Sequence, residues 1–284
     1  DEAFSAKMNK FAFAVALPAL LFQDISAVDI RESWNGGFVL FCFIATFLSI
    51  TGVTVLSFFV VKREERGEFV QGAYRSSAAI LGIAFIQNIY GTSGMAPLMI
   101  IGTVPLYNAF AVIVLSLLKP GQRKMDKALL QKTLKGIVTN PIILGIAAGF
   151  VWAILKIPQP EILQKTVKNM AVLATPLGLM AMGASFEGKK ALGKLKPTLI
   201  ASALKLVVLA AIFLPIAVWL GYRESELVAI LVMLGSATTV SSFVMARNMG
   251  HEGVLTSSIV MVTTLCSAFT LTGWLFLLKT LGLV

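Results

Sequence analysis

This sequence has few charged residues, two cysteines and one histidine. Only 13% of its 284 residues are charged and 57% are hydrophobic, with a mean hydropathy of +0.86, whereas a soluble domain has roughly 25% charged and 45–50% apolar residues. Because His251 is the single histidine, a cluster of histidines that binds a metal is excluded. Cys42 and Cys266 lie in separate apolar segments, so we expect buried hydrophobes with neither metal-ligand spacing nor a disulfide.

Catalytic and energy-coupling motifs are missing too. The chain has no Gly-x-x-x-x-Gly-Lys-Ser/Thr sequence and no Ser/His/Asp set, so an ATP-driven pump and an enzyme are both disfavoured. All fourteen acidic residues fall in loops or at segment ends, so we expect no carboxylate relay inside the membrane. We therefore expect no cofactor, no metal and no nucleic acid partner, and the coupling ion, proton or sodium, is left open.

Nine apolar stretches follow one another along the chain. A hydrocarbon core about 30 Å thick needs roughly 20 apolar residues per helix. The stretches that approach this length are 8–25, 37–61, 73–90, 95–118, 135–157, 167–186, 197–221, 227–249 and 254–283. They predict an all-α polytopic membrane protein with one membrane transport domain over residues 1–284.

The net charge of +10 is distributed by loop, which indicates topology rather than nucleic acid binding. One predicted side carries Lys7, Lys10, Lys62, Arg63, Arg66, Arg75, Lys119, Arg123, Lys124, Lys127, Lys132, Lys135, Lys189, Lys190, Lys194, Lys196 and Arg247. The other side carries Arg31, Lys156, Lys165, Lys168, Arg223 and Lys279. The positive-inside rule puts the larger set in the cytoplasm. We expect a multi-pass protein of the inner (cytoplasmic) membrane with its C-terminus outside.

The two halves of the chain match under a shift of 158 or 159 residues. The matches are Val15-Ala16-Leu17-Pro18 with Leu173-Ala174-Thr175-Pro176, Gly36 with the segment after Lys194, Gly91-Thr92-Ser93-Gly94 with Gly250-His251-Glu252-Gly253, and 106–110 with 265–269. Their charges predict opposite orientations, and hence an inverted repeat. Repeat one covers 1–118, a linker 119–134 and repeat two 135–284. Because 135–157 has no counterpart, we expect that a first helix is missing and that the intact protein has ten.

The equivalent stretches 73–90 and 227–249 are crowded with small and hydroxylated residues. Such residues weaken helices and supply hydrogen bonds, although in membranes they also serve tight helix packing. Their matched positions predict two broken helices that cross near the midplane and bind a substrate there. The predicted site residues are Ser77, Gly82, Thr238, Thr239 and Ser241.

Two further polar residues lie inside apolar stretches. Lys205 lies about 12 Å into its helix, at 1.5 Å per residue, and a lysine near the membrane centre costs about 2.5–3.5 kcal/mol. Three roles are open to it: balancing an anionic substrate, bracing an unwound helix, or extending toward the cytoplasm. Asn140, just before Pro141, is expected to bind substrate, to cap its helix or to bond another helix.

Several short stretches, in order along nearly the whole chain, resemble the auxin efflux carrier family. They are Asn9-Lys10-Phe11, 16–22, Tyr74-Arg75-Ser76 through Gly82, Pro105-Leu106-Tyr107-Asn108, Asn140-Pro141-Ile142 and 241–246. The short central loop is closer to the bacterial malate and malonate permeases than to the plant auxin exporters. The resemblance implies inverted five-helix repeats of the bile-acid-transporter type, a scaffold plus a transport domain, and two crossing broken helices.

The resemblance also bears on individual residues. Ser77, Ala84 and Ala237 stand where the family often has Asn, Pro and Pro, so this sequence departs from the pattern at the expected crossing. Lys205 matches the family's lysine in the eighth helix.

The function expected from these observations is secondary active transport. The substrate would be a small organic anion, such as malate, malonate or an auxin-like acid, moved by alternating access. A sodium-coupled bile-acid-type symporter, a channel and a membrane receptor are the alternatives. The expected partners are the anion and membrane lipid, and the sequence leaves a homodimer open.

The charge pattern yields a testable topology. Residues 119–135 carry six basic residues and should face the cytoplasm. A cysteine introduced at Lys132 should therefore resist a membrane-impermeant thiol reagent added outside intact cells, whereas a cysteine at Lys156 should react. Ready labelling at Lys132 would overturn the orientation and the argument for inversion.

Overall fold

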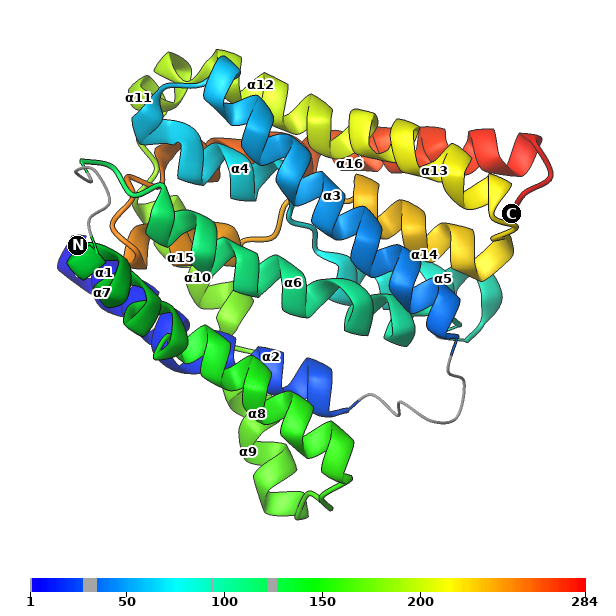
Figure 1. Cartoon of the computed structure of the whole chain (residues 1–284), viewed down its shortest axis with the longest axis horizontal. Coiled ribbons are helices and arrows are strands. Elements are labelled where there is room, and N and C mark those ends of the chain that lie inside the picture. Colours follow the sequence, from blue (N-terminus) through cyan, green and yellow to red (C-terminus); the bar gives the residue numbers. More distant parts are fainter. Residues whose placement is uncertain (1, 28–34, 93, 122–126) are drawn as a thin grey trace.

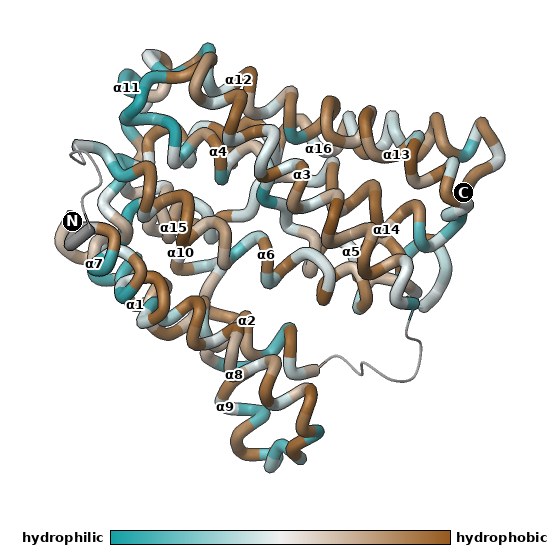
Figure 2. Tube along the Cα trace, in the orientation of Figure 1, coloured by the Kyte–Doolittle hydropathy of each residue, from teal (hydrophilic) through white to brown (hydrophobic). Residues whose placement is uncertain are grey.

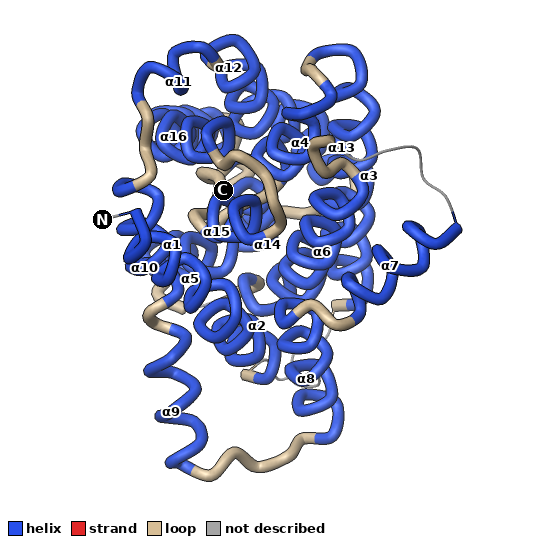
Figure 3. The backbone as a smooth tube through the Cα atoms, turned by 90° about the vertical axis from the view of Figure 1, so that its left-hand side faces the viewer, coloured by secondary structure: helices blue, strands red, loops and turns tan. Residues whose placement is uncertain are grey.

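The computed structural model describes residues 2–27, 35–92, 94–121 and 127–284, and every regular element in these ranges is helical (Figure 1, Figure 3). Six helices are long and apolar enough to cross a membrane: Ala3–Ser26, Gly36–Val60, Ala96–Leu117, Glu161–Ala184, Leu195–Trp219 and Val254–Thr280. A pair bent by 48°, Leu130–Val138 with Pro141–Leu155, would make a seventh. The protein is therefore a polytopic helical membrane protein, while the nine expected spans and the ten-helix parent stay predictions.

Short irregular turns interrupt several of these helices. A π-helical turn at Ala12–Ala16 joins α1 to α2, and another at Leu204–Val208 joins α12 to α13. The helices are α1 (Glu2–Phe11), α2 (Leu17–Ser26), α3 (Gly36–Val60), α4 (Arg66–Tyr74), α5 (Ala78–Tyr90), α6 (Ala96–Leu117), α7 (Lys127–Val138), α8 (Pro141–Leu155), α9 (Glu161–Ala171), α10 (Ala174–Ala184), α11 (Gly188–Gly193), α12 (Leu195–Ala203), α13 (Leu209–Trp219), α14 (Glu224–Gly235), α15 (Ser241–Asn248) and α16 (Val254–Thr280).

The helices pack in two groups. In the first, α2 lies against α8 and α9, and α1 lies against α10. In the second, α3 packs on α6, α12 on α16, and α14 on both α5 and α13. Figure 1 shows the first group along the lower edge of the molecule and the second above it. A boundary between two helix groups therefore runs through the protein.

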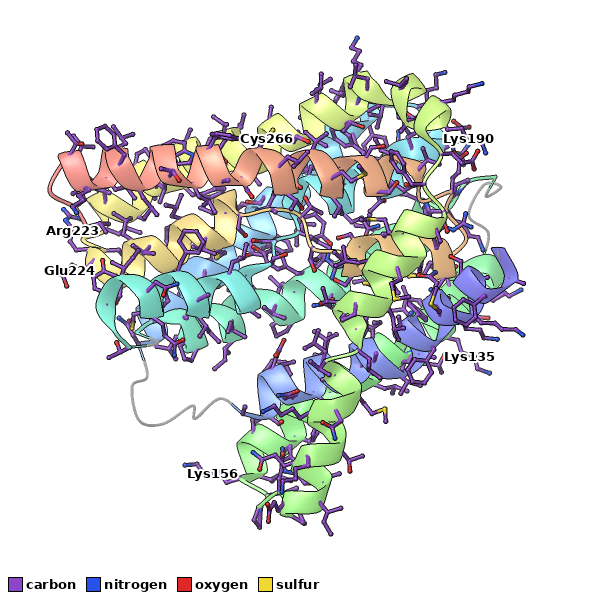
Figure 4. The ribbon with its side chains drawn as sticks, turned by 180° about the vertical axis from the view of Figure 1, so that it is seen from behind. Lys135, Lys156, Lys190, Arg223, Glu224 and Cys266 are labelled. Carbon is purple, nitrogen blue, oxygen red and sulfur yellow. The ribbon has the colours of Figure 1, made fainter. Side chains whose placement is uncertain are left out.

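Polarity follows the long axis of the molecule. Figure 2 shows hydrophobic residues along the helices and hydrophilic residues gathered toward their ends. Lys135 and Lys190 lie at one end of the long axis and Arg223 at the other (Figure 4). These ends match the two predicted sides, although the membrane and the side of the C-terminus stay predictions.

Four glycines take the same unusual backbone in both halves. Gly91 and Gly94 precede α6 with φ of 74° and 47°, and Gly250 and Gly253 precede α16 with φ of 85° and 79°. Residues other than glycine are strained in this left-handed region. These pairs are the ones that the 159-residue shift brings together, which supports the repeat at this point, while the repeat architecture as a whole stays a prediction.

Glu68 is a buried acidic residue in the first turn of its helix, outside the apolar stretches. It lies inside α4 with 3% of its surface exposed. One carboxylate oxygen accepts from the Gly253 amide at 2.9 Å, and the other accepts from the amide and hydroxyl of Thr256 at 2.9 and 3.0 Å. Glu68 therefore caps the first turn of α16, where a negative charge is favoured. The sequence missed it because α4 begins at Arg66, before the apolar stretch.

Replacing Glu68 tests this capping role. Glu68→Ala leaves two amides and a hydroxyl without their acceptor, and a lost charge-assisted hydrogen bond costs about 1.5–3 kcal/mol. We expect a clear fall in the unfolding temperature of the purified protein in detergent. The exposed carboxylate variant Glu161→Ala should unfold as the unchanged protein does, because its ion pair with Lys165 is solvated. Equal unfolding temperatures for both variants would contradict the role.

Candidate functional site at the helix interruptions

Two helices are interrupted inside the second group, at equivalent places in the two halves. Between α4 and α5 the break is Arg75-Ser76-Ser77, and between α14 and α15 it covers residues 236–240. Arg75 and Ser236, the first residues after α4 and α14, are both extended, with ψ of 145° and 164°. At both breaks the backbone therefore leaves the first half-helix in the same extended conformation before the next half-helix begins.

The two interruptions contact each other directly. The backbone amide of Ser77 donates to the carbonyl of Ala237 at 3.0 Å, so a backbone hydrogen bond joins the two breaks. The hydroxyls of Ser76 and Ser236 are also hydrogen-bonded to each other. Hydrocarbon offers no partner for backbone groups that a break exposes. The crossing solves this by letting each break satisfy the other.

Hydroxyl groups extend the exchange to the ends of the first half-helices. Ser76 donates its hydroxyl to the Val232 carbonyl of α14 at 3.0 Å. Thr238 donates its own to the Gly72 carbonyl of α4 at 2.7 Å. Each break therefore supplies a donor to a carbonyl near the C-terminal end of the opposite helix, although the Val232 carbonyl also accepts from the Ser236 amide at 3.2 Å.

Lys205 braces the end of α14. It lies in the π-helical turn between α12 and α13 with none of its surface exposed. Its ammonium donates to the carbonyls of Met233 at 3.2 Å and Leu234 at 2.5 Å. The hydroxyl of Tyr107 donates to the same Met233 carbonyl at 2.8 Å. Of the three roles open from the sequence, the contacts match the bracing of an unwound helix.

Arg75 is the buried cation of the crossing, with 1% of its surface exposed. One terminal nitrogen donates to Asn108 Oδ1 at 2.7 Å and to Ser241 Oγ at 2.8 Å, and the other lies 2.9 Å from Met245 Sδ. Its Nε has no partner among the described residues. None of the ion pairs between described residues includes Arg75. A full positive charge is thus held by neutral groups alone.

This position corrects the sequence analysis, which counted Arg75 among the cytoplasmic residues. Counting by loop treats a basic residue at the start of an apolar stretch as exposed. The helix begins at Arg66, however, so Arg75 lies beyond its last turn and inside the break. Ser77, two residues further on and already assigned to the site, was the signal that could have included it.

A small cavity of about 60 Å³ lies beside the crossing, on the boundary between the two helix groups. Three predicted site residues line it: Ser77, Thr239 and Ser241. The sequence analysis did not assign its other polar lining residues to the site. These are Arg75 and Ser76 in the first break, Asp24 on α2, Tyr107 and Asn108 on α6, and Thr175 on α10. Tyr107 and Asn108 were visible in the sequence as part of the family-like stretch 105–108 and of the repeat match at 106–110.

The other four predicted residues do not line this cavity. Thr238 and Lys205 support the crossing through the bonds described above. Gly82 packs against α6, where a Cβ on it would come 2.7 Å from Met99 Cε. Asn140 caps α8 by accepting from the Ile142 amide at 2.9 Å, one of the alternatives left open for it. Asparagine and glycine are common both in binding sites and in helix caps and packing contacts, which explains why the sequence analysis included Asn140 and Gly82 in the site.

No cluster of three or more His, Cys, Asp or Glu side chains that could hold a metal occurs among the described residues.

The chain matches the family described as "Membrane transport protein" over residues 1–275. It is 26% identical over 283 residues to a protein of Rhizobium meliloti (strain 1021) named "Putative malonate transporter". That match covers 96% of this chain and 86% of the relative.

The bracing role of Lys205 gives a prediction. Lys205→Met keeps the length of the side chain but removes the charged donor of the Leu234 carbonyl and leaves the Met233 carbonyl with Tyr107 alone, at about 1–3 kcal/mol for a buried unsatisfied group. We expect a lower unfolding temperature in detergent and lost transport, with insertion retained. Lys279→Met, on the last turn of α16, should change neither. Wild-type stability of Lys205→Met would show that the carbonyls need no such donor.

Proposed function

Because this chain belongs to the membrane transport protein family, we propose that it is a secondary carrier that moves a small organic anion by alternating access. The family and the relative are transporters, so the chain is a transport protein and not an enzyme. The proposal includes the cytoplasmic membrane as its location, a C-terminus on the outside, and repeats at 1–118 and 135–284.

The observation that carries the proposal is the charge of Arg75. Burying an ionised group without a counter-charge is costly, and such groups in membrane proteins mark substrate or ion pathways. Arg75 lines the cavity and keeps an unused Nε donor. A guanidinium is a fork of donors that matches a carboxylate. An organic anion in the cavity would supply the charge that Asn108 and Ser241 lack.

The ends of the half-helices reinforce this preference for an anion. Helices α5 and α15 begin at Ala78 and Ser241, on either side of the crossing. A helix N-terminus carries partial positive charge and unpaired amides. Hydroxyls of Ser77, Thr239 and Ser241 line the same space. The site therefore offers a carboxylate one full charge, two dipole ends and several neutral donors.

The size and place of the cavity favour a small substrate and a carrier. Its volume of about 60 Å³ is far below the roughly 300–1,000 Å³ of pockets for drug-sized ligands. It is walled by α2 and α10 of one helix group and by the crossing and α6 of the other. Displacement of one group against the other would open it to either side in turn. Malonate, named for the relative, and malate are the first substrates to test.

Counterflow in proteoliposomes tests the carrier and its site together. The unchanged protein should exchange labelled malonate or malate saturably against unlabelled anion, which a channel does not. Losing a charge-assisted hydrogen bond costs about 1.5–3 kcal/mol, so Arg75→Gln should raise the Kd roughly 10- to 100-fold. Ser77→Leu and Thr239→Leu should each abolish transport while the protein still inserts.

Arg247→Gln is the matched control, because Arg247 is an exposed arginine on α15 outside the cavity. It should transport as the unchanged protein does. Normal exchange by the Arg75, Ser77 and Thr239 variants would show that the substrate binds elsewhere. If the unchanged protein exchanges no malonate, malate or auxin-like acid, the carrier proposal itself fails.

A further inference from the structure

The cavity has a second charged residue, Asp24, on its α2 wall. Leu17, Leu20, Leu21 and Asp24 line it at the spacing of one helix face. The wall therefore runs from leucines to a carboxylate over seven residues, about 10 Å at 1.5 Å per residue. The sequence analysis placed this acidic residue at a segment end, but it faces the same space as Arg75.

Asp24 and Arg75 do not neutralise each other. Neither takes part in an ion pair of the described residues. The partners of Arg75 are Asn108, Ser241 and Met245, and no hydrogen bond of the described residues involves the Asp24 carboxylate. A cation and a carboxylate thus line one cavity without contact, which leaves both available to a third group between them.

We propose that Asp24 holds the far end of a dicarboxylate whose near end lies at Arg75, and that one proton is carried with each substrate. This rests on the proposed function. The near carboxylate takes the guanidinium donors, and the far carboxyl meets Asp24. Two carboxylates that face each other in one small cavity repel each other, so one proton is shared between them. The proton enters with the dicarboxylate from one side and leaves with it on the other.

The remaining groups around Asp24 do not supply this proton. Tyr107 on α6 also lines the cavity, but its hydroxyl is committed to the Met233 carbonyl. Helices α8 and α9 pack on α2, and no ion pair between described residues joins one of their charged groups to Asp24. Lys156, Lys165 and Lys168 line a separate cavity beside Gln23 and Ser26, and Glu161 pairs with Lys165. Asp24 is therefore the carboxylate that faces the bound substrate.

The test is the pH dependence of malonate counterflow, with Asp24→Asn as the variant. In the unchanged protein, exchange at low malonate should rise as the pH falls, by up to about tenfold per pH unit, the limit for one proton. The asparagine amide donates to a fully ionised carboxylate, so Asp24→Asn should flatten this profile and move the dianion without a proton. Glu161→Gln, which removes an exposed carboxylate outside the cavity, should keep the profile of the unchanged protein.

Charge movement gives an independent readout. In net uptake, as opposed to one-for-one counterflow, the current per labelled malonate should be about one negative charge in the unchanged protein and about two in Asp24→Asn, read from the dependence on membrane potential. An unchanged pH profile and an unchanged charge ratio in Asp24→Asn would overturn the proposal, because substrate protonation alone would then explain the pH effect.

If Asp24→Asn inserts but moves no malonate, the Kd of malonate for the purified variant is measured over the same pH range. A Kd that no longer depends on pH supports the proposal. A Kd that still decreases as the pH is lowered, as in the unchanged protein, overturns it. Failure of the carrier itself is distinguishable, because the unchanged protein would then show no counterflow at any pH.

Discussion

A backbone group without a hydrogen-bond partner costs several kcal/mol in hydrocarbon, and both interrupted helices expose such groups. The structure meets this constraint by crossing the two breaks. The Ser77 amide bonds the Ala237 carbonyl, and Ser76 and Thr238 reach the carbonyl ends of the opposite helices. Lys205 supplies the donors that the end of α14 still needs.

The same crossing determines the electrostatics of the cavity. Each break turns a helix N-terminus inward, and Arg75 adds a full charge whose partners are neutral. Satisfying the backbone uses the hydroxyls of Ser76 and Thr238, which are therefore structural. Ser77, Thr239 and Ser241 line the cavity, and the Ser241 hydroxyl bonds only side chains there. Neighbouring residues of one motif thus divide into those that hold the crossing and those that are available to a substrate.

The sequence predicted where the helices break, because small and hydroxylated residues at matched repeat positions are visible without a structure. It could not predict how deeply individual charged side chains lie inside the protein. Arg75, Glu68 and Asp24 all fall near the ends of apolar stretches, and hydropathy assigns such positions to loops. In the fold, α4 starts before its apolar stretch and α2 carries its carboxylate along a cavity wall. Which polar side chain caps a helix and which faces a cavity, as for Asn140 and Asp24, depends on packing between distant segments.

The two halves also show where the symmetry ends. Under the 159-residue shift, Lys205 matches Thr46 and Arg75 matches Leu234, so each of these buried cations lies at a position where the other half has no cation. Lys205, in the second half, donates to two backbone carbonyls. The cation of the first half bonds only side chains and retains a spare donor. Side-chain partners can exchange for a ligand without exposing backbone to hydrocarbon, whereas carbonyl partners cannot. This difference explains why Arg75, rather than Lys205, is suited to bind and release an anion.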